Sequence, residues 1–168
     1  MKSMGKVLAC IVFAGACPVA FADGTSVQAK VPYAETSLVA DNIKTECSID
    51  VQLAQAVKQN ADATGNPIVL TEQAPDAEQG RFLKMEIVDA QSTGNAWTGH
   101  LKSVAVRGWL YADGQQVAGF AARRLSRGGF GAGFKGSCAV LERTVKAIGR
   151  DISTWLSNPV DGARLGDL

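Results

Sequence analysis

The spacing of apolar residues predicts two helices, one early in the chain and one close to its end. In the first, Ile49, Leu53 and Val57 fall on one face of a helix over about residues 48–60. In the second, over about residues 137–156 with Ser137 as the expected N-cap, apolar residues recur every three or four positions, at Cys138, Leu141, Val145, Ile148, Ile152 and Trp155. Each helix therefore has one apolar face to bury against a sheet.

Alternation of apolar and polar residues predicts strands between these helices. Residues 81–90 alternate clearly, with the odd-numbered Leu83, Met85 and Ile87 on one side. Two further runs rich in strand-forming residues, 101–111 and 115–125, flank the dipeptide Asp113-Gly114. That dipeptide is typical of a two-residue hairpin turn. Shorter strands are expected at residues 37–43 and 68–70.

The turn at Asp113-Gly114 predicts how the hairpin divides its side chains between two faces. A two-residue turn places Leu110 opposite Val117 and, further along the ladder, Gly108 opposite Gly119 and Val106 opposite Ala121. The other face then carries Ala105, Arg107, Trp109, Tyr111, Ala118, Phe120 and Ala122. That second face is more apolar than a solvent-facing sheet. Either another segment covers it, or it is a binding face centred on Arg107, Trp109, Tyr111 and Phe120.

These elements predict an α+β fold, a mainly antiparallel sheet of about four strands with two helices packed on one face. We expect a signal peptide at residues 1–22, an extended leader at 23–36, a single domain at 37–158 and a flexible tail at 159–168.

The first residues have the composition of an export signal. Lys2 and Lys6 precede an apolar run, and Ala20 and Ala22 stand at the spacing that a signal peptidase reads. We therefore expect cleavage after Ala22 and a periplasmic or extracellular mature protein.

Two alternatives to cleavage after Ala22 fit the sequence less well. A membrane anchor is disfavoured because the apolar run is shorter than the roughly 20 residues needed to span a bilayer. A lipoprotein anchored at Cys17 is disfavoured because Ala14 and Pro18 depart from the usual lipid-attachment pattern. No later segment resembles a transmembrane run.

The charge balance gives no reason to expect nucleic acid as a partner. The chain has 17 Lys and Arg against 16 Asp and Glu, and removing Lys2 and Lys6 with the leader changes the formal net charge from +1 to −1.

Only Cys47 and Cys138 follow the leader, and an exported protein meets an oxidising compartment, so a disulfide between them is the expected state. Redox or metal use and two free thiols are the alternatives. There is no CxxC motif and His100 is the only histidine, so neither a metal site nor a cofactor is expected.

A glycine-rich stretch, "RGGFGAGFKGSC", lies directly before the second helix. Phe134 and Gly136 break the pattern of a nucleotide-binding P-loop. A simpler anion or partner site remains, because converging backbone N–H groups, a helix N-terminus and basic side chains attract anions. Its candidate residues are Arg124, Arg127, Gly129, Gly131, Gly133 and Lys135. The alternative is a flexible connection.

Candidate catalytic residues are few. His100 lies at a boundary between a loop and a strand, and no linear signature of a nucleophile with its base is present. Glu86 and Asp89 fall on opposite sides of one strand and so do not form a carboxylate pair. The sequence therefore favours a protein without enzymatic activity.

The export signal, the strand over residues 81–90 and the stretch "GQQVAGFAARRLSRGGFGAGFKGSCAVLERTVKAIGRDISTWL" together resemble bacterial exported domains of unknown function. More distantly, they resemble the small α+β domains of envelope-assembly lipoproteins. The resemblance covers about the second half of the chain, and it implies an envelope location without assigning an activity.

Three functions follow as hypotheses. The first is a non-enzymatic periplasmic or secreted binding module of the bacterial envelope, which uses the Trp109 and Phe120 face or the glycine-rich loop to bind an envelope component or a protein. The second is a secreted inhibitor or effector-like protein that acts on another protein. The third is a small hydrolase. The sequence indicates no oligomeric state.

Overall fold

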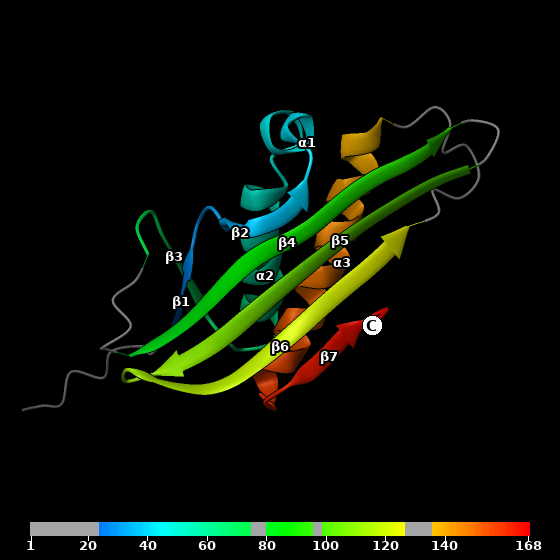
Figure 1. Ribbon diagram of the computed structural model, residues 1–168. Helices are drawn as coiled ribbons and strands as arrows, with labels where there is room; N and C mark the ends of the chain where they lie inside the picture. Colours follow the sequence, from blue (N-terminus) through cyan, green and yellow to red (C-terminus); the bar gives the residue numbers. More distant parts are fainter. Residues whose placement is uncertain (1–23, 75–79, 96–98, 127–135) are drawn as a thin grey trace, which may run out of the picture.

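The computed structural model describes residues 24–74, 80–95, 99–126 and 136–168, and the predicted signal peptide lies outside these ranges. Within these ranges the elements follow one another in the order shown in Figure 1. They are β1 (Thr25–Gln28), β2 (Tyr33–Val39), α1 (Asp41–Glu46), α2 (Ile49–Ala63), β3 (Ile68–Thr71), β4 (Arg81–Asn95), β5 (Gly99–Ala112), β6 (Gln115–Ser126), α3 (Ser137–Ser157) and β7 (Ala163–Gly166).

The sheet is mixed and has seven strands, in the order β3-β1-β4-β5-β6-β7, with β2 also paired to β4. The predicted fold, a mainly antiparallel sheet of about four strands with two helices, was therefore wrong. The antiparallel core β4-β5-β6 was found from its alternation, but β1, β2, β3 and β7 were not all recognised. Those four strands span only four to seven residues and pair in parallel with segments distant in the sequence. Short strands that pair in parallel show little of the alternation between apolar and polar residues by which a strand is recognised in a sequence.

The three helices lie on one face of the sheet, where α2 and α3 run side by side (Figure 1). Their apolar stripes and the inward side chains of β4, β5 and β6 form the core, whose fully buried members include Ile49, Leu53, Val57, Leu83, Ile87, Val104, Leu110, Leu141, Ile148 and Ile152. Gly149 allows the two helices to approach closely, since a Cβ there would stand 2.6 Å from the Cβ of Ala56. The helical stripes seen in the sequence thus place the core correctly.

The hairpin between β5 and β6 differs from its predicted register by one residue. Asp113 and Gly114 form the turn, both with positive φ. An irregularity between Leu110 and Tyr111 then places Leu110 opposite Ala118 and Gly108 opposite Phe120. A one-residue shift turns every following side chain to the other face. Ala118, Phe120 and Ala122 therefore face the helices, not the exposed side.

Phe120 shows the consequence of that shift. Its ring packs edge-on against Trp155 of α3, with centroids 4.9 Å apart, and only 5% of the residue is exposed. The ring also covers Gly108, where a Cβ would stand 2.5 Å from the ring edge. The binding face predicted around Trp109 and Phe120 is therefore divided between the two sides of the sheet.

The chain ends that we expected to be a leader and a tail contribute strands. Residues 23–36 contain β1 and the start of β2, and residues 159–168 contain β7, which pairs in parallel with β6. The amide of Asp167 donates to the carbonyl of Arg123 at 2.7 Å, and the Asp167 carboxylate accepts from the amide of Leu125.

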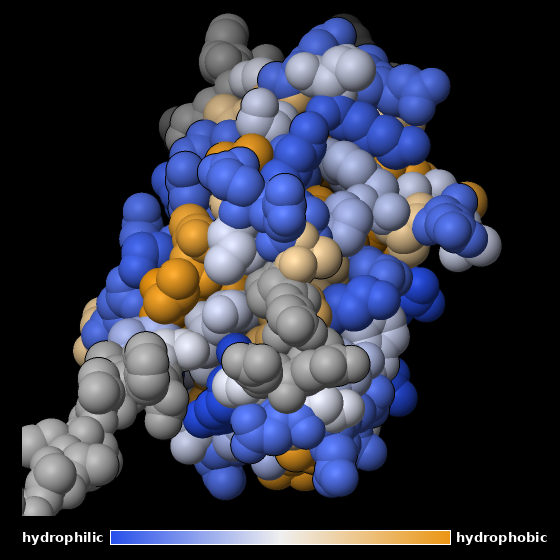
Figure 2. All heavy atoms as spheres, turned by 90° about the vertical axis from the view of Figure 1, so that its left-hand side faces the viewer, coloured by the Kyte–Doolittle hydropathy of each residue, from blue (hydrophilic) through white to orange (hydrophobic). Residues whose placement is uncertain are grey.

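On the side bordered by β3, β1 and β2, the apolar side chains lie in patches between hydrophilic ones (Figure 2).

Candidate functional site

One edge of β4 is occupied by two strands in succession and then left open. β1 pairs with Phe82 and Leu83, and β2 pairs with β4 from Ile87 to Ala90. β2 ends at Val39, opposite Ala90, but β4 continues to Asn95. Residues 91–95 therefore have β5 on one side and no described strand on the other (Figure 1).

A groove of about 620 Å³ lies along this open edge. Its walls come from the end of β2, from α1 and the residue after it, from β4, and from the start of α3. The lining residues are Leu38, Ala40, Asn42, Ile43, Glu46, Cys47, Ala90, Gln91, Ser92, Thr93, Gly136, Ser137 and Cys138. The lining is part polar and part apolar, which suits a ligand that carries both kinds of group.

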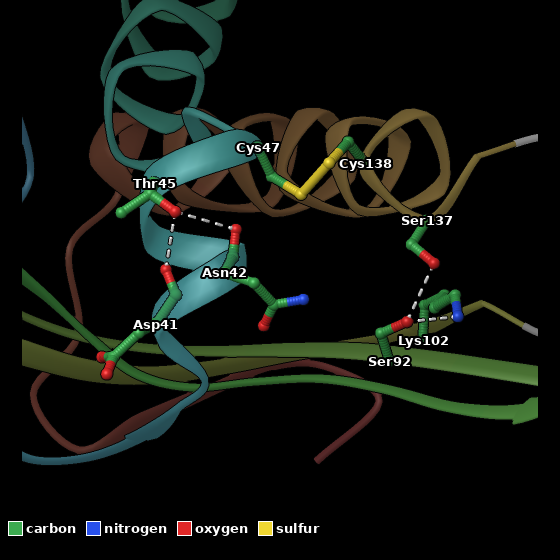
Figure 3. Close-up of a disulfide and its surroundings, with 8 residues drawn as sticks. All are labelled: Asp41, Asn42, Thr45, Cys47, Ser92, Lys102, Ser137 and Cys138. Carbon is green, nitrogen blue, oxygen red and sulfur yellow. Dashed lines mark hydrogen bonds between the residues drawn. A yellow bond between two sulfur atoms is a disulfide. The ribbon is translucent and has the colours of Figure 1, made fainter.

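The disulfide holds two walls of the groove together. Cys47 follows α1 and Cys138 lies in the first turn of α3; their Cα atoms are 4.8 Å apart and 91 residues separate them in sequence (Figure 3). The predicted Cys47–Cys138 disulfide is therefore confirmed. The covalent link fixes the distance between the two helix ends that border the groove.

Three polar side chains form a chain of hydrogen bonds at one end of the groove. Lys102 Nζ donates to Ser92 Oγ, and Ser92 Oγ donates to Ser137 Oγ at 3.1 Å (Figure 3). Ser92 and Lys102 are register partners on β4 and β5, and both face the helices. The chain of bonds leads from the sheet interior to Ser137 at the start of α3.

Lys102 is a buried cation without a carboxylate partner in the part of the chain that the structure describes. The residue is 3% exposed, and burial lowers the pKa of its amine because desolvation disfavours the ammonium form. The sequence has no Asp or Glu between Asp89 and Asp113, nor between Asp113 and Glu142. The end of the groove at Ser92 and Ser137 is therefore electropositive.

The start of α3 adds to this positive character. Its N-cap, Gly136, makes no side-chain cap hydrogen bond, and the first turn carries no acidic residue. The first amides of a helix carry a partial positive charge, which an anion satisfies. Sequence reasoning did not single out Ser92 and Lys102. The signal was present, because Lys102 follows the same alternation as the buried Val104 and Val106.

The exposed side of the sheet carries a second cluster, centred on Trp109. Lys84 Nζ lies 5.5 Å and Arg107 Cζ 5.3 Å from the centre of the Trp109 ring. Arg107 also donates to Glu86 at 2.7 and 2.9 Å. Partial burial acts to raise the pKa of Glu86, but the hydrogen bonds from Arg107 and Lys84 outweigh it and lower the pKa. The cations of this cluster are thus shared with a carboxylate of the same protein.

The other two aromatic residues of the predicted binding face, Tyr111 and Phe120, lie on opposite sides of the sheet. Tyr111 stacks on Phe82, with ring centroids 6.1 Å apart, and belongs to the same side as Trp109. Phe120 is on the opposite side, as described above. The structure therefore brings together Arg107, Trp109 and Tyr111 but excludes Phe120 from that face.

The predicted anion site at the glycine-rich loop is only partly described. Arg127, Gly129, Gly131, Gly133 and Lys135 lie outside the described residues, as does the side chain of His100. Arg124 makes hydrogen bonds of 2.7 Å with both carboxylate oxygens of Asp151 and lies 3.2 Å from Asp167. The bonds to Asp151 raise the pKa of the guanidinium further. Arg124 is therefore paired within the protein.

The described residues lack the features of a metal centre and of a membrane span. They contain no group of three or more His, Cys, Asp or Glu side chains that could hold a metal ion. Nor do they include a helix long and apolar enough to cross a membrane.

No protein-family model and no curated protein matches the sequence. Solved structures do match. A Xanthomonas campestris protein of the DUF330 family has a TM-score of 0.54 at 12% identity, over 80% of this chain and 83% of that one. A minor lipoprotein from Acinetobacter baumannii has a TM-score of 0.49 at 13% identity, over 80% and 90%. Lipoprotein GNA1162 from Neisseria meningitidis has a TM-score of 0.44 at 12% identity, over 77% and 99%.

The distant resemblance to bacterial proteins of unknown function expected from the sequence is confirmed, at the level of fold, by the Xanthomonas campestris DUF330 protein. At these identities the likeness is one of fold. It assigns no ligand and no residue role to this chain.

Proposed function

We propose that this protein is an exported accessory module of the bacterial cell envelope that binds a partner in the groove beside the disulfide. The observation that carries the proposal is the open edge of β4 at residues 91–95, enclosed by α1 and the start of α3. The predicted export signal supports the location. Binding and accessory functions do not require the catalytic constellation that the sequence lacks.

The disulfide supports the proposal because it constrains the binding site and not merely the core. A groove with a fixed width binds with a smaller loss of conformational entropy than one whose walls must be ordered by the ligand. Cys47 and Cys138 both line the groove. An oxidising compartment, where the bond persists, is the place in which this groove is complete.

Site-specific photo-crosslinking in the native envelope tests the proposal. Asn42 and Gln91, which line the groove, are replaced one at a time by photoreactive benzoylphenylalanine, and exposed Ala63 at the end of α2 serves as the matched control. We expect both groove positions to capture the same envelope component, identified by mass spectrometry, and Ala63 to capture none of it. Capture of that component from Ala63 to the same extent, or no adduct from either groove position, would contradict the proposal.

Export is tested separately by intact mass. Protein purified from the envelope should begin at Asp23 and should gain two alkylated thiols only after reduction. A mass that corresponds to a lipid attached to Cys17 would contradict cleavage after Ala22 and would show a membrane-anchored protein.

A second candidate function, hydrolysis of an acyl compound, is favoured by the contact between Ser92 Oγ and Lys102 Nζ. A lysine with a lowered pKa can remove the proton of a serine hydroxyl, whose oxygen then attacks a carbonyl carbon; the bond to the leaving group breaks, the lysine returns the proton to that group, and water hydrolyses the acyl-serine. A fluorophosphonate probe distinguishes the two functions. Labelling of Ser92 that disappears in Lys102→Met would favour the hydrolase. If Ser92 of the wild-type protein is not labelled, the hydrolase function is excluded.

A further inference from the structure

We infer that the partner enters the groove as an extended peptide segment, which adds a strand to β4 and places an acidic side chain against Ser92 and Ser137. This inference deepens the proposed function and rests on it. It names the class of partner, an extended acidic peptide, and the contacts that select it. The argument combines the free strand edge, the alternation of side chains along a strand and the distribution of charge in the groove.

The backbone of β4 supplies the first part of the recognition. Beyond Ala90, alternate residues on the side away from β5 present N–H and C=O groups that no described strand pairs. Exposed edges of this kind accept an added strand, whose main chain completes the ladder. The same edge already accepts β1 and then β2, and where the pairing with β2 begins the Ile87 amide donates to the Pro32 carbonyl at 2.9 Å. A peptide beyond Val39 would be the next segment in that row.

The pleat of the sheet decides which peptide side chains enter the groove. Ala90 and Ser92 face the helices, so every second side chain of an added strand also points toward the space between α1 and α3. Two such side chains are about 7 Å apart along the strand. One lies beside Ala90 and Ile43, where the wall is apolar, and the next lies beside Ser92 and Ser137.

The charges select an acidic group at the second position. Lys102 is buried without a described carboxylate partner, and its Nζ donates to the hydroxyl of Ser92, which lines the groove (Figure 3). Ser137 Oγ accepts from Ser92, which leaves its own proton free to be donated into the groove. A carboxylate there receives this hydroxyl hydrogen bond and lies at the start of α3, whose N-cap is a glycine without a side chain to accept from the first amides. It also supplies a negative charge close to Lys102, which has no described carboxylate partner.

Glu46 limits the alternatives at the other end of the groove. It lies on α1, is exposed, and lines the groove. An acidic side chain near Glu46 would be repelled, so the carboxylate of the peptide is directed toward Ser92 and Ser137. The preferred segment therefore has an apolar side chain two residues from an acidic one.

Two capped eight-residue peptides test the inference with the whole mature protein. Both alternate threonine and valine; in the first an aspartate replaces one central valine, and in the second an asparagine does so. Amide NMR titration measures affinity, and hydrogen exchange reports which backbone groups become protected. We expect the aspartate peptide to bind at least tenfold more tightly and to slow exchange in residues 91–93.

The matched variants are Lys102→Met and Lys84→Met. The first removes the buried charge, and the second removes an exposed lysine from the other side of the sheet. We expect Lys102→Met to abolish the preference for aspartate and Lys84→Met to keep it. Protection at the exposed edge strand β3 in place of residues 91–93, or equal affinity of the wild-type protein for both peptides, would overturn the inference.

The two proposals can fail separately. If crosslinks at Asn42 and Gln91 identify an envelope component while neither peptide binds, the groove is the binding site but its occupant is not an extended acidic peptide. If the aspartate peptide binds with the expected protection while no envelope component is captured, the peptide recognition stands without the proposed envelope role.

Discussion

At the residue scale, the most informative side chain is Lys102. A buried ammonium without a charged partner is costly, because removing it from water disfavours the charged form by several kcal/mol before its hydrogen bonds are counted. Residues kept at such a cost are found most often at functional sites. The hydrogen bond to Ser92 offsets part of the cost of burial and places the Lys102 amine next to a residue that lines the groove.

Replacing Lys102 should therefore stabilise the folded protein. We expect Lys102→Met, which preserves the length and apolar stem of the side chain, to raise the free energy of unfolding by about 1 kcal/mol at pH 7. The folded protein lowers the pKa of Lys102, so in the window between that value and the unfolded value near 10.4 the unfolded chain binds more protons. The free energy of unfolding of the wild-type protein then rises with pH through this window, and the difference in free energy of unfolding between Lys102→Met and the wild type becomes smaller.

Urea unfolding of both proteins at pH 7 and pH 10 measures this gap. A variant less stable than wild type at pH 7 would show that Lys102 has a stabilising partner instead.

The corrected hairpin register gives a second prediction at the same scale. Phe120 is buried against Trp155, so Phe120→Ala should lower the free energy of unfolding by about 3 to 5 kcal/mol. Trp109 is half-buried on the exposed side, held by Lys84 and Arg107, and Trp109→Ala should cost about 1 kcal/mol. The same urea experiment compares the two. Equal losses would support the register predicted from the two-residue turn.

At the scale of elements, the contact between α2 and α3 depends on one glycine. A Cβ at Gly149 would stand 2.6 Å from the Cβ and 2.8 Å from the carbonyl carbon of Ala56, and 3.0 Å from the amide nitrogen of Val57. Two of these atoms belong to the backbone and cannot rotate away. The helices would have to separate to accommodate the methyl group.

Gly149→Ala therefore sets helix propensity against packing. Alanine favours the helix by about 1 kcal/mol over glycine, whereas overpacking a core costs about 1 to 3 kcal/mol and more where backbone must move. We expect a net loss of stability in thermal unfolding. The control is Ala147→Gly, at a half-buried position of α3, which measures the effect of helix propensity at a site away from Ala56. If Gly149→Ala instead raises the stability, the two helices can separate at little cost in free energy.

At the scale of the whole molecule, the disulfide joins parts of the chain that the sheet does not join directly. The Cys47–Cys138 bond spans 91 residues and links the end of α1 to the start of α3. Closing a loop of that length removes conformational freedom from the unfolded chain, which corresponds to about 4 to 5 kcal/mol in the chain-entropy description. The bond therefore serves stability as well as the geometry of the groove.

The double substitution Cys47→Ser with Cys138→Ser should lower the free energy of unfolding by about 4 kcal/mol. Circular dichroism should still report a folded protein, because Cys47 is one buried member of a large core and the other apolar side chains between the sheet and the helices are unchanged. Peptide affinity in the groove should fall as well, since the two walls are no longer held. A variant with unchanged affinity would assign the disulfide to stability alone.

The sequence by itself determined what depends on local periodicity and composition. The stripes of α2 and α3, the alternation in β4 and the turn at Asp113-Gly114 are properties of a few consecutive residues, and these four features are present in the structure. The strand expected at residues 37–43, which has no clear alternation, was wrong in its second half, because β2 ends at Val39 and α1 begins at Asp41. The pairing of Cys47 with Cys138 followed from the absence of any other cysteine after the leader. None of these inferences required knowledge of distant neighbours.

Only the tertiary structure decided the parallel edge strands, the register of β6 and the groove. β1, β2, β3 and β7 are short and paired with segments far away, so their hydrogen-bonding partners leave no local pattern. The one-residue irregularity after Leu110 has no signature in composition, yet it moved Phe120 into the core. Lys102, Ser92 and Ser137 come from three elements, and their meeting depends on how β4 and β5 pair and where the disulfide holds α3. Local sequence specifies elements, whereas a site built from their ends exists only once long-range pairing has set their relative positions.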